Sequence, residues 1–214
     1  MLIEYACYDE LIYEQVRDNI FQALDCGVGS ISVPAIHMNK IYSIIPEGIV
    51  LSCPIDYPDG RSTSKLRQHA ALNAIRNGAT TIDLVANHVL LVNNKQDQYL
   101  HDLRSIFNIT NKNKTSLRLM IDERKTKHKK QVAFGMQMAK SIGIEYGYCS
   151  TGTFSEDIVD NIILCEKIQR TVGINLITNA TINNPTQIEL AKKANLFGIR
   201  FHHINILKAC MSGV

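Results

Sequence analysis

The chain has 214 residues, of which 45% are hydrophobic and 20% charged, and its formal net charge at pH 7 is +3. Such a chain can form one globular domain with a large core, and so small a net charge does not by itself indicate a nucleic acid or an anionic membrane as partner. No apolar stretch approaches the roughly 18 residues of a membrane span, the first residues carry no secretory signal pattern, and six cysteines lack CxxC spacing. We therefore expect a cytoplasmic protein without a disulfide framework, bound to neither membrane nor nucleic acid.

Short apolar runs alternate with amphipathic segments along the whole chain. The eight runs expected to form strands are Leu2–Cys7, Ser30–Val33, Ile49–Cys53, Thr81–Val85, Leu117–Ile121, Ile144–Tyr148, Gly173–Ile177 and Phe197–Phe201. Helices are expected between them. Ile12, Val16, Ile20 and Leu24 recur every four residues, as on the buried face of a helix. A later helix is expected to start at Asn184-Pro185, with Gln187 three residues beyond the cap.

Strand–helix units with continuously apolar strands are typical of parallel sheets buried on both faces. Eight such units predict a closed (β/α)₈ TIM barrel, and an open doubly wound sheet is the alternative. No linker or low-complexity segment divides the chain, so we expect residues 1–214 to form a single domain.

Several stretches, in order along nearly the whole chain, resemble deoxyribose-phosphate aldolases. The stretch NGATTIDLVAN at positions 77–87 is similar to the family's N-G-A-x-E-I-D-M-V-x-N, and YGYCSTG at 146–152 resembles its F-[VI]-K-T-S-T-G. Gly29–Val33, Cys53-Pro54-Ile55 and Arg200-Phe201 also match. The resemblance implies a TIM barrel with carbon–carbon lyase activity, and homo-oligomers of the kind this family forms.

The family's signature residues are replaced at several positions. Tyr148 stands where the resemblance places the lysine that forms a Schiff base, and a phenol cannot form an imine. The helper lysine of G-x-K-x-x-G-G appears as Asn175. Its paired glycines are lost within residues 177–179, and the R-F-G-[AT]-S-S phosphate loop has become RFHHIN at 200–205. Ordinary cleavage of deoxyribose phosphate is therefore not expected.

Carboxylates remain at two matching positions. Asp83 corresponds to the family's catalytic-site aspartate, and Glu4 falls at the position of a second one. Our leading hypothesis is an aldolase-like lyase that acts on a small carbonyl or hydroxylated metabolite without an imine. Asp83 and Glu4 would shuttle protons, Tyr148 and Asn175 would hydrogen-bond an enolate-like oxygen, and His202 would be an auxiliary base.

Further groups at predicted strand ends are expected to bind the substrate. We expect the substrate to be a small molecule, either anionic or neutral. These candidates are Asn87, Asp122, Ser150, Thr151 and Lys125. No cofactor and no metal are expected. Lys125 belongs to a basic run at residues 124–130, predicted to open the fifth helix, where cations oppose the helix dipole. The run is either a solvated face, an attractor of anions, or the source of a relocated Schiff-base amine.

Two other functions stay open. The first is a catalytically silent barrel that binds a ligand or a partner, in which Tyr148 fills the lysine's volume and packs against His202. Asp83, Asn87 and His202 would then have structural roles. The second is a metal-dependent lyase, with His88, Asp83, Asp122 and His202 as candidate ligands. Cys53 and Cys149, at strand ends, are either packing residues or nucleophiles.

Overall fold

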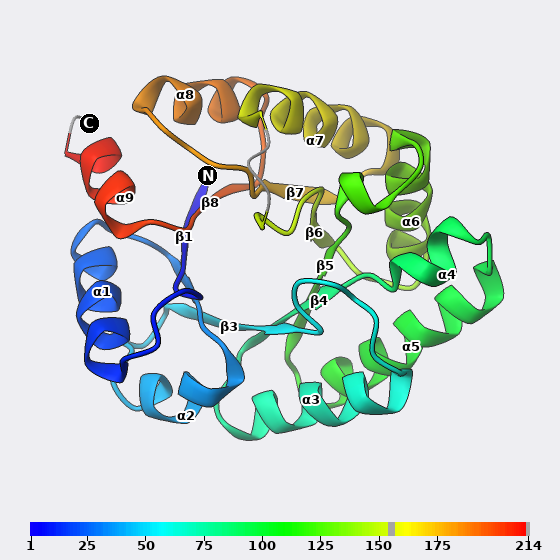
Figure 1. Ribbon diagram of the computed structural model, residues 1–214, viewed down its shortest axis with the longest axis horizontal. Helices are drawn as coiled ribbons and strands as arrows, with labels where there is room; N and C mark the ends of the chain where they lie inside the picture. Colours follow the sequence, from blue (N-terminus) through cyan, green and yellow to red (C-terminus); the bar gives the residue numbers. More distant parts are fainter. Residues whose placement is uncertain (154–156, 213–214) are drawn as a thin grey trace.

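The computed structural model describes residues 1–153 and 157–212, and at its centre eight parallel strands close into a barrel in chain order (Figure 1). The strands are β1 Leu2–Ala6, β2 Ser30–Ser32, β3 Val50–Ile55, β4 Thr81–Val85, β5 Ser116–Met120, β6 Tyr146–Tyr148, β7 Asn175–Thr178 and β8 Gly198–Phe201. Strand β8 pairs with β1, with Gly198 opposite Leu2, and this pairing closes the barrel. The predicted (β/α)₈ TIM barrel is confirmed, and the open-sheet alternative is wrong.

The helices form a ring around the strands (Figure 1). They are α1 Tyr13–Asp25, α2 Ala35–Tyr42, α3 Ser64–Arg76, α4 His88–Val92, α5 Gln96–Lys112, α6 Lys129–Ser141, α7 Ile158–Val172, α8 Pro185–Lys193 and α9 Ile204–Met211. The predicted stripe of α1 is buried at Val16 and Ile20. The predicted start of α8 is a capping box, in which Asn184 and Gln187 cap each other's backbone. None of the helices among the described residues is long and apolar enough to cross a membrane.

The basic run differs from its prediction. Residues Glu123–Lys125 form a short 3₁₀ turn, η1, and α6 begins only at Lys129. Most of the run therefore lies in the connection between β5 and α6 rather than in the helix. The physical reason is local, because Asp122 accepts a hydrogen bond from the backbone N–H of Arg124 and starts the tighter turn first.

The main apolar core lies between the strands and the helices. It contains the side chains that alternate outward along the strands, such as Tyr5, Ile31 and Leu51. A second, much smaller apolar cluster lies inside the barrel and consists of Val85, Met120, Tyr148 and Ile177, with Leu2 and Tyr57 packed against it. TIM-barrel interiors are usually filled by branched aliphatic side chains. Here polar and charged side chains share that space, and they form the candidate site.

Candidate functional site

Four charged side chains meet inside the barrel. Strand register places Glu4 of β1 beside Arg200 of β8, and Asp83 of β4 beside Arg118 of β5. All four are buried, with at most 4% of any one exposed. Two guanidinium groups and two carboxylates give the cluster a formal charge of zero. Charges at this depth are stable only when they are paired and hydrogen-bonded, so the stability of the barrel depends on this pairing.

Hydrogen bonds across the barrel join the two pairs into one network. Arg118 donates to Glu4 Oε2 at 2.7 Å and, through Nε, to Asp83 Oδ1 at 2.5 Å. Arg200 donates to the same two carboxylates from the other side. Each carboxylate is therefore held by both arginines, an arrangement that combines charge attraction with fixed geometry. We call Glu4, Asp83, Arg118, Arg200 and Tyr148 the central network.

Tyr148 completes this network. Its hydroxyl donates to Glu4 Oε1 at 3.0 Å and accepts from Arg200 Nη2 at 2.7 Å. The Arg200 guanidinium also lies 4.2 Å from the centre of the Tyr148 ring, within the range of a cation–π contact. The Tyr148 side chain is fully buried. The Tyr148 hydroxyl thus both donates and accepts a hydrogen bond within the protein.

Serine hydroxyls add further hydrogen bonds to carboxylate oxygens that already accept from the arginines. Ser30 donates to Glu4, and Ser52 donates to Asp83 Oδ2 at 3.0 Å. None of the central network's side-chain nitrogen and oxygen atoms is among the buried polar atoms that lack a partner in the described part of the chain. The network is therefore satisfied without any ligand.

The surroundings fix the protonation states of these groups. Burial acts to raise the pKa of Glu4, but attraction by Arg118 and Arg200 outweighs it and lowers that pKa to about 2. Burial raises the pKa of Tyr148 well above 10, although the neighbouring arginines act against it. Burial, aided by repulsion from Arg200, lowers the pKa of His202 to about 3. At neutral pH Glu4 is thus an anion, while Tyr148 and His202 are neutral.

Two tyrosines from loops cover the network at the mouth of the barrel. The Tyr8 hydroxyl lies 2.7 Å from Ser32 Oγ and accepts a hydrogen bond from Arg200 at 3.1 Å. Tyr57, from the loop between β3 and α3, stacks at a tilt on Tyr8 with ring centres 4.8 Å apart. Tyr57 also packs on the apolar cluster inside the barrel. Arg200, which bonds to Tyr8, and Tyr148, in the cluster on which Tyr57 packs, are both fully buried.

His202 lies beside this cover and is held by an amide. Its Nε2 is 2.7 Å from Asn179 Oδ1, while Asn179 Nδ2 donates to the carbonyl of Ser150 at 3.1 Å. Because Asn179 presents its oxygen to the ring, Nε2 carries the proton of the neutral imidazole. The ring of His202 also lies 5.9 Å from that of Tyr8. Its partner at the mouth is thus Tyr8, where the silent-barrel hypothesis predicted Tyr148.

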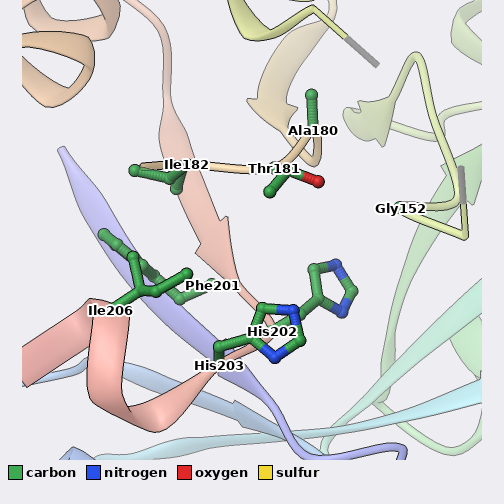
Figure 2. A pocket seen from close by; sticks show the side chains of 8 residues that line it. All are labelled: Gly152, Ala180, Thr181, Ile182, Phe201, His202, His203 and Ile206. Atoms are coloured by element: carbon green, nitrogen blue, oxygen red, sulfur yellow. The ribbon is translucent and has the colours of Figure 1, made fainter. Parts of the chain in front are cut away.

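The hollow at this end of the barrel is small. Figure 2 shows the rings of His202 and His203 with Ile182, Phe201 and Ile206 on one side and Gly152 on the other. The hollow has a volume of about 30 Å³. One water needs on the order of 10–15 Å³ measured this way, so the space suits one or two waters and is too small for a sugar phosphate.

The predicted substrate-binding residues mostly hold loops together. Asn87 caps α4 by accepting from the backbone N–H of Leu90 at 3.1 Å, which is the structural alternative for that residue. Asp122 accepts from the Thr151 hydroxyl at 2.7 Å, and Ser150 Oγ accepts from a backbone N–H of its own loop. Asp122, Ser150 and Thr151 are fully buried. Their polar atoms are directed at neighbouring loops.

Lys125 and Asn175 lie outside the central network. Lys125 Nζ donates to the carbonyl of Pro58 at 2.6 Å and to Asp59 at 2.9 Å, and thereby ties its loop to the loop that carries Tyr57. Asn175 begins β7 and lies opposite Tyr146 in register. It is therefore two positions further from the mouth than Tyr148, about 7 Å along the barrel. Asn175 and Tyr148 do not share the single oxygen site predicted for them.

The alternative metal ligands are not brought together. No three His, Cys, Asp or Glu residues within 1–153 and 157–212 form a group that could hold a metal ion. His88 Nε2 accepts from the backbone N–H of Asp122 at 3.0 Å, whereas Asp83 is bound in the central network. Burial raises the pKa of the Cys53 thiol to about 12. That thiol is protonated at neutral pH, which argues against the nucleophile hypothesis for Cys53.

Arg118, Arg200, Tyr8 and Tyr57 are parts of the site to which sequence reasoning gave no role, although Arg200 lies in a stretch that resembles the family. The signal for Arg118 is visible in the sequence, because an arginine within the apolar strand Leu117–Ile121 must find a carboxylate if that strand is buried. Its two partners, Glu4 and Asp83, interrupt their own apolar strands in the same way. No comparable signal marks Tyr8 or Tyr57, which reach the mouth from loops.

Comparisons with known proteins agree with the fold and with the expected resemblance. No family model matches the chain. A deoxyribose-phosphate aldolase of Natranaerobius thermophilus is 26% identical over 178 residues, covering 78% of this chain and 74% of that protein. One from Clostridium kluyveri is 24% identical over 155 residues, covering 70% of each. The tetrameric deoxyribose phosphate aldolase of Aeropyrum pernix has a TM-score of 0.86 at 17% identity, covering 99% of this chain and 90% of that one. The predicted resemblance to deoxyribose-phosphate aldolases is confirmed.

Proposed function

We propose that this chain is a divergent relative of the deoxyribose-phosphate aldolases that has lost imine chemistry and acts by binding rather than by cleaving carbon–carbon bonds. One observation carries the proposal. The groups that would have to serve a substrate at the barrel centre are already bonded to one another, and none of their buried polar atoms lacks a partner. A site prepared for a substrate keeps donors and acceptors aimed at the space that the substrate fills.

The distribution of lysines supports this proposal. None of the eight described strands contains a lysine, so no amine projects into the barrel from a strand. Lys125 is the candidate for a relocated amine, and its Nζ is engaged by a carbonyl and a carboxylate. An imine requires a free, uncharged amine as nucleophile. The pairing of Lys125 with Asp59 opposes that state.

A second candidate is the acid–base lyase, and one contact favours it. The Tyr148 hydroxyl lies between Glu4 and Arg200, so a neutral acid, a carboxylate and a cation form a chain along which a proton could move. For such an enzyme to act, Tyr8 and Tyr57 would have to move away from the mouth. The same Tyr148 contacts explain the network's stability without catalysis, so we rank this function second.

Borohydride trapping tests the first proposal. The protein is mixed with acetaldehyde, glyceraldehyde 3-phosphate or deoxyribose 5-phosphate and treated with borohydride, and its intact mass is measured by mass spectrometry. An aldolase that forms a Schiff base is treated in the same way as the positive control. We expect an adduct on the control alone. Release of aldehyde from deoxyribose 5-phosphate is followed in parallel, and none is expected. A substrate-dependent adduct mapped to Lys125 would overturn the loss of imine chemistry, and turnover without an adduct would favour the acid–base lyase.

Assembly and location remain proposals of the same kind. The Aeropyrum pernix relative is a tetramer, which supports our prediction of a homo-oligomer for this chain. Light scattering after gel filtration measures the mass directly, and a species of the 24.0 kDa chain mass at all concentrations would contradict it. The cytoplasmic location and the small-molecule ligand are likewise predictions from the sequence.

A further inference from the structure

The basic run that no catalytic role explains borders a separate hollow, on the outer side of the barrel between α4 and the start of α6. Its volume is about 480 Å³, within the usual range of small-molecule sites. Lys127, His128 and Lys130 line one part, and Leu91, Val92 and Phe134 line another. No acidic side chain is among its described lining residues. We call this space the basic hollow.

The cations of the basic hollow are not balanced by the protein. Lys125 and Lys129, their neighbours in the run, face Asp59 at 2.9 Å and Glu123 at 3.8 Å. Lys127 and Lys130 form no ion pair with any described residue, and both are exposed. The positive charges of Lys127 and Lys130, without a counter-charge, repel each other, and a bound anion would weaken that repulsion.

The backbone adds to the same imbalance. Helix α6 has no acidic residue in its first turn and no side-chain cap at His128. The positive end of the helix dipole therefore coincides with Lys129 and Lys130, which costs free energy unless an anion lies nearby. Glu123, 3.8 Å from Lys129, offsets one of these charges, and Gln131 Oε1 accepts from the backbone N–H of Lys127 just before the helix at 2.8 Å. The charges of Lys127 and Lys130 stay without a counter-charge among the described residues.

The apolar part of the hollow limits the kind of anion. Leu91 is buried, whereas Phe134 is 36% exposed, and both line the hollow together with the lysines. An aromatic ring next to exposed cations suits a ligand that has both an apolar portion and a charged group. Inorganic phosphate would use the lysines alone and leave the ring of Phe134 in water.

We propose that the basic hollow binds a phosphate monoester with an apolar or aromatic portion. Lys127, Lys130 and the first N–H groups of α6 would hold the phosphate, and Phe134 with Val92 would contact the rest. The site lies apart from the central network and from the hollow at the barrel mouth. Its test therefore does not depend on whether the barrel is an enzyme.

Phenyl phosphate is the probe, followed by chemical shifts of the backbone amides, with phenol and inorganic phosphate as the two partial probes. We expect phenyl phosphate to shift amides of residues 127–134 and 91–92 and to bind more tightly than either partial probe. Lys127→Gln together with Lys130→Gln should weaken binding by about tenfold, because two charge-assisted contacts are lost. Phe134→Ala should abolish the preference for phenyl phosphate over inorganic phosphate.

A matched control separates a site from general attraction. Lys112 and Lys114 are also exposed and form no ion pair with the described residues, and they lie at the far end of α5. Lys112→Gln with Lys114→Gln removes the same charge and should change the affinity by less than about twofold. Equal weakening by both double variants would overturn the proposal, as would the absence of shifts in residues 127–134 with folded protein.

Discussion

The central network and the basic hollow differ in whether their charges are paired. Inside the barrel two arginines and two carboxylates are buried, mutually bonded and neutral as a set. Beside α6 two lysines are exposed and unbalanced within the described structure. Burial explains the difference, because an unpaired charge in the interior costs several kcal/mol, whereas water tolerates an unpaired charge at the surface.

This contrast changes where a ligand should be sought. In an aldolase-like barrel the mouth and centre are the natural place to look. Here the polar atoms of the central network are all hydrogen-bonded, and Tyr8 and Tyr57 pack over them. These charges therefore contribute to folding stability rather than to ligand binding. The unbalanced surface charge is not required by folding, and it is the better indicator of binding.

The largest effect is expected from breaking the network on one side. Arg200→Met leaves Glu4 and Asp83 each short of a partner in the interior. We expect the free energy of unfolding to fall by about 3–5 kcal/mol, as when one partner of a buried ion pair is removed. Urea denaturation followed by circular dichroism measures it.

The control for that variant is an arginine on the surface. Arg170 is 79% exposed and lies 3.8 Å from Glu166 on the same helix. Arg170→Met should change the free energy of unfolding by less than about 0.5 kcal/mol. If both variants lost the same stability, the central network would not be the stabilising element described here.

Acid should destabilise the protein through the neutral, buried His202. Its pKa is about 3 in the folded chain, below the ordinary 6.5, so between these values the unfolded chain binds more protons. Stability from this group is therefore full above pH 6.5 and is lost as the pH falls toward 3. Between pH 7 and pH 5 the loss should be about 2 kcal/mol.

His202→Gln isolates that contribution, because glutamine does not titrate. We expect the loss of stability between pH 7 and pH 5 to become smaller in the variant. It will not vanish, because His88, with a pKa lowered by burial to about 4, acts in the same direction. Glu4 acts at lower pH, where its stabilisation is lost between about 4.5 and 2. An unchanged pH dependence in His202→Gln would show that His202 is not held neutral.

The sequence predicted the scaffold well because the scaffold depends on repeating patterns. Eight apolar runs with helical stripes between them are enough for the barrel, and the cap at Asn184 could be read directly. The run that contains Asp83 was also correctly predicted to form a strand. What could not be read was the partner of each charge, because Glu4 and Arg118 are 114 residues apart and meet only once the barrel closes.

Asn175 and Lys125 do not reach the central network as predicted, and the reason is related. A strand residue's depth in the barrel depends on register, and Asn175 is at the far end of β7 from the mouth. The reach of Lys125 depends on the loop at 57–59, whose conformation has no periodic signal in the sequence. The cover formed by Tyr8 and Tyr57 escaped prediction for the same reason.

A smaller effect is expected from removing one hydroxyl of the network. Tyr148→Phe keeps the ring and its contact with Arg200 but removes one of two hydrogen-bond partners from Glu4 Oε1 and from Arg200 Nη2. We expect the free energy of unfolding to fall by about 1–3 kcal/mol, since one buried N–H of Arg200 loses its acceptor and Glu4 loses one of its donors. The second function predicts loss of turnover in the same variant in addition to this loss of stability. Denaturation and a lyase assay on one preparation distinguish the two.

The smallest effect on global stability should come from Lys125, whose contacts hold the cover of the barrel rather than the network beneath it. Lys125→Met removes the bonds to Pro58 and Asp59, so the loop that carries Tyr57 loses its tie to the loop after β5. We expect faster amide hydrogen exchange in residues 57–62, with unchanged exchange in β1, β4, β5 and β8, because local opening does not require the barrel to unfold. Lys127→Met is the control, since Lys127 has no described partner in that loop. If Lys125→Met instead accelerated exchange in the four strands, the cover and the network would be one cooperative unit, and the barrel centre would be protected by its mouth as well as by its own ion pairs.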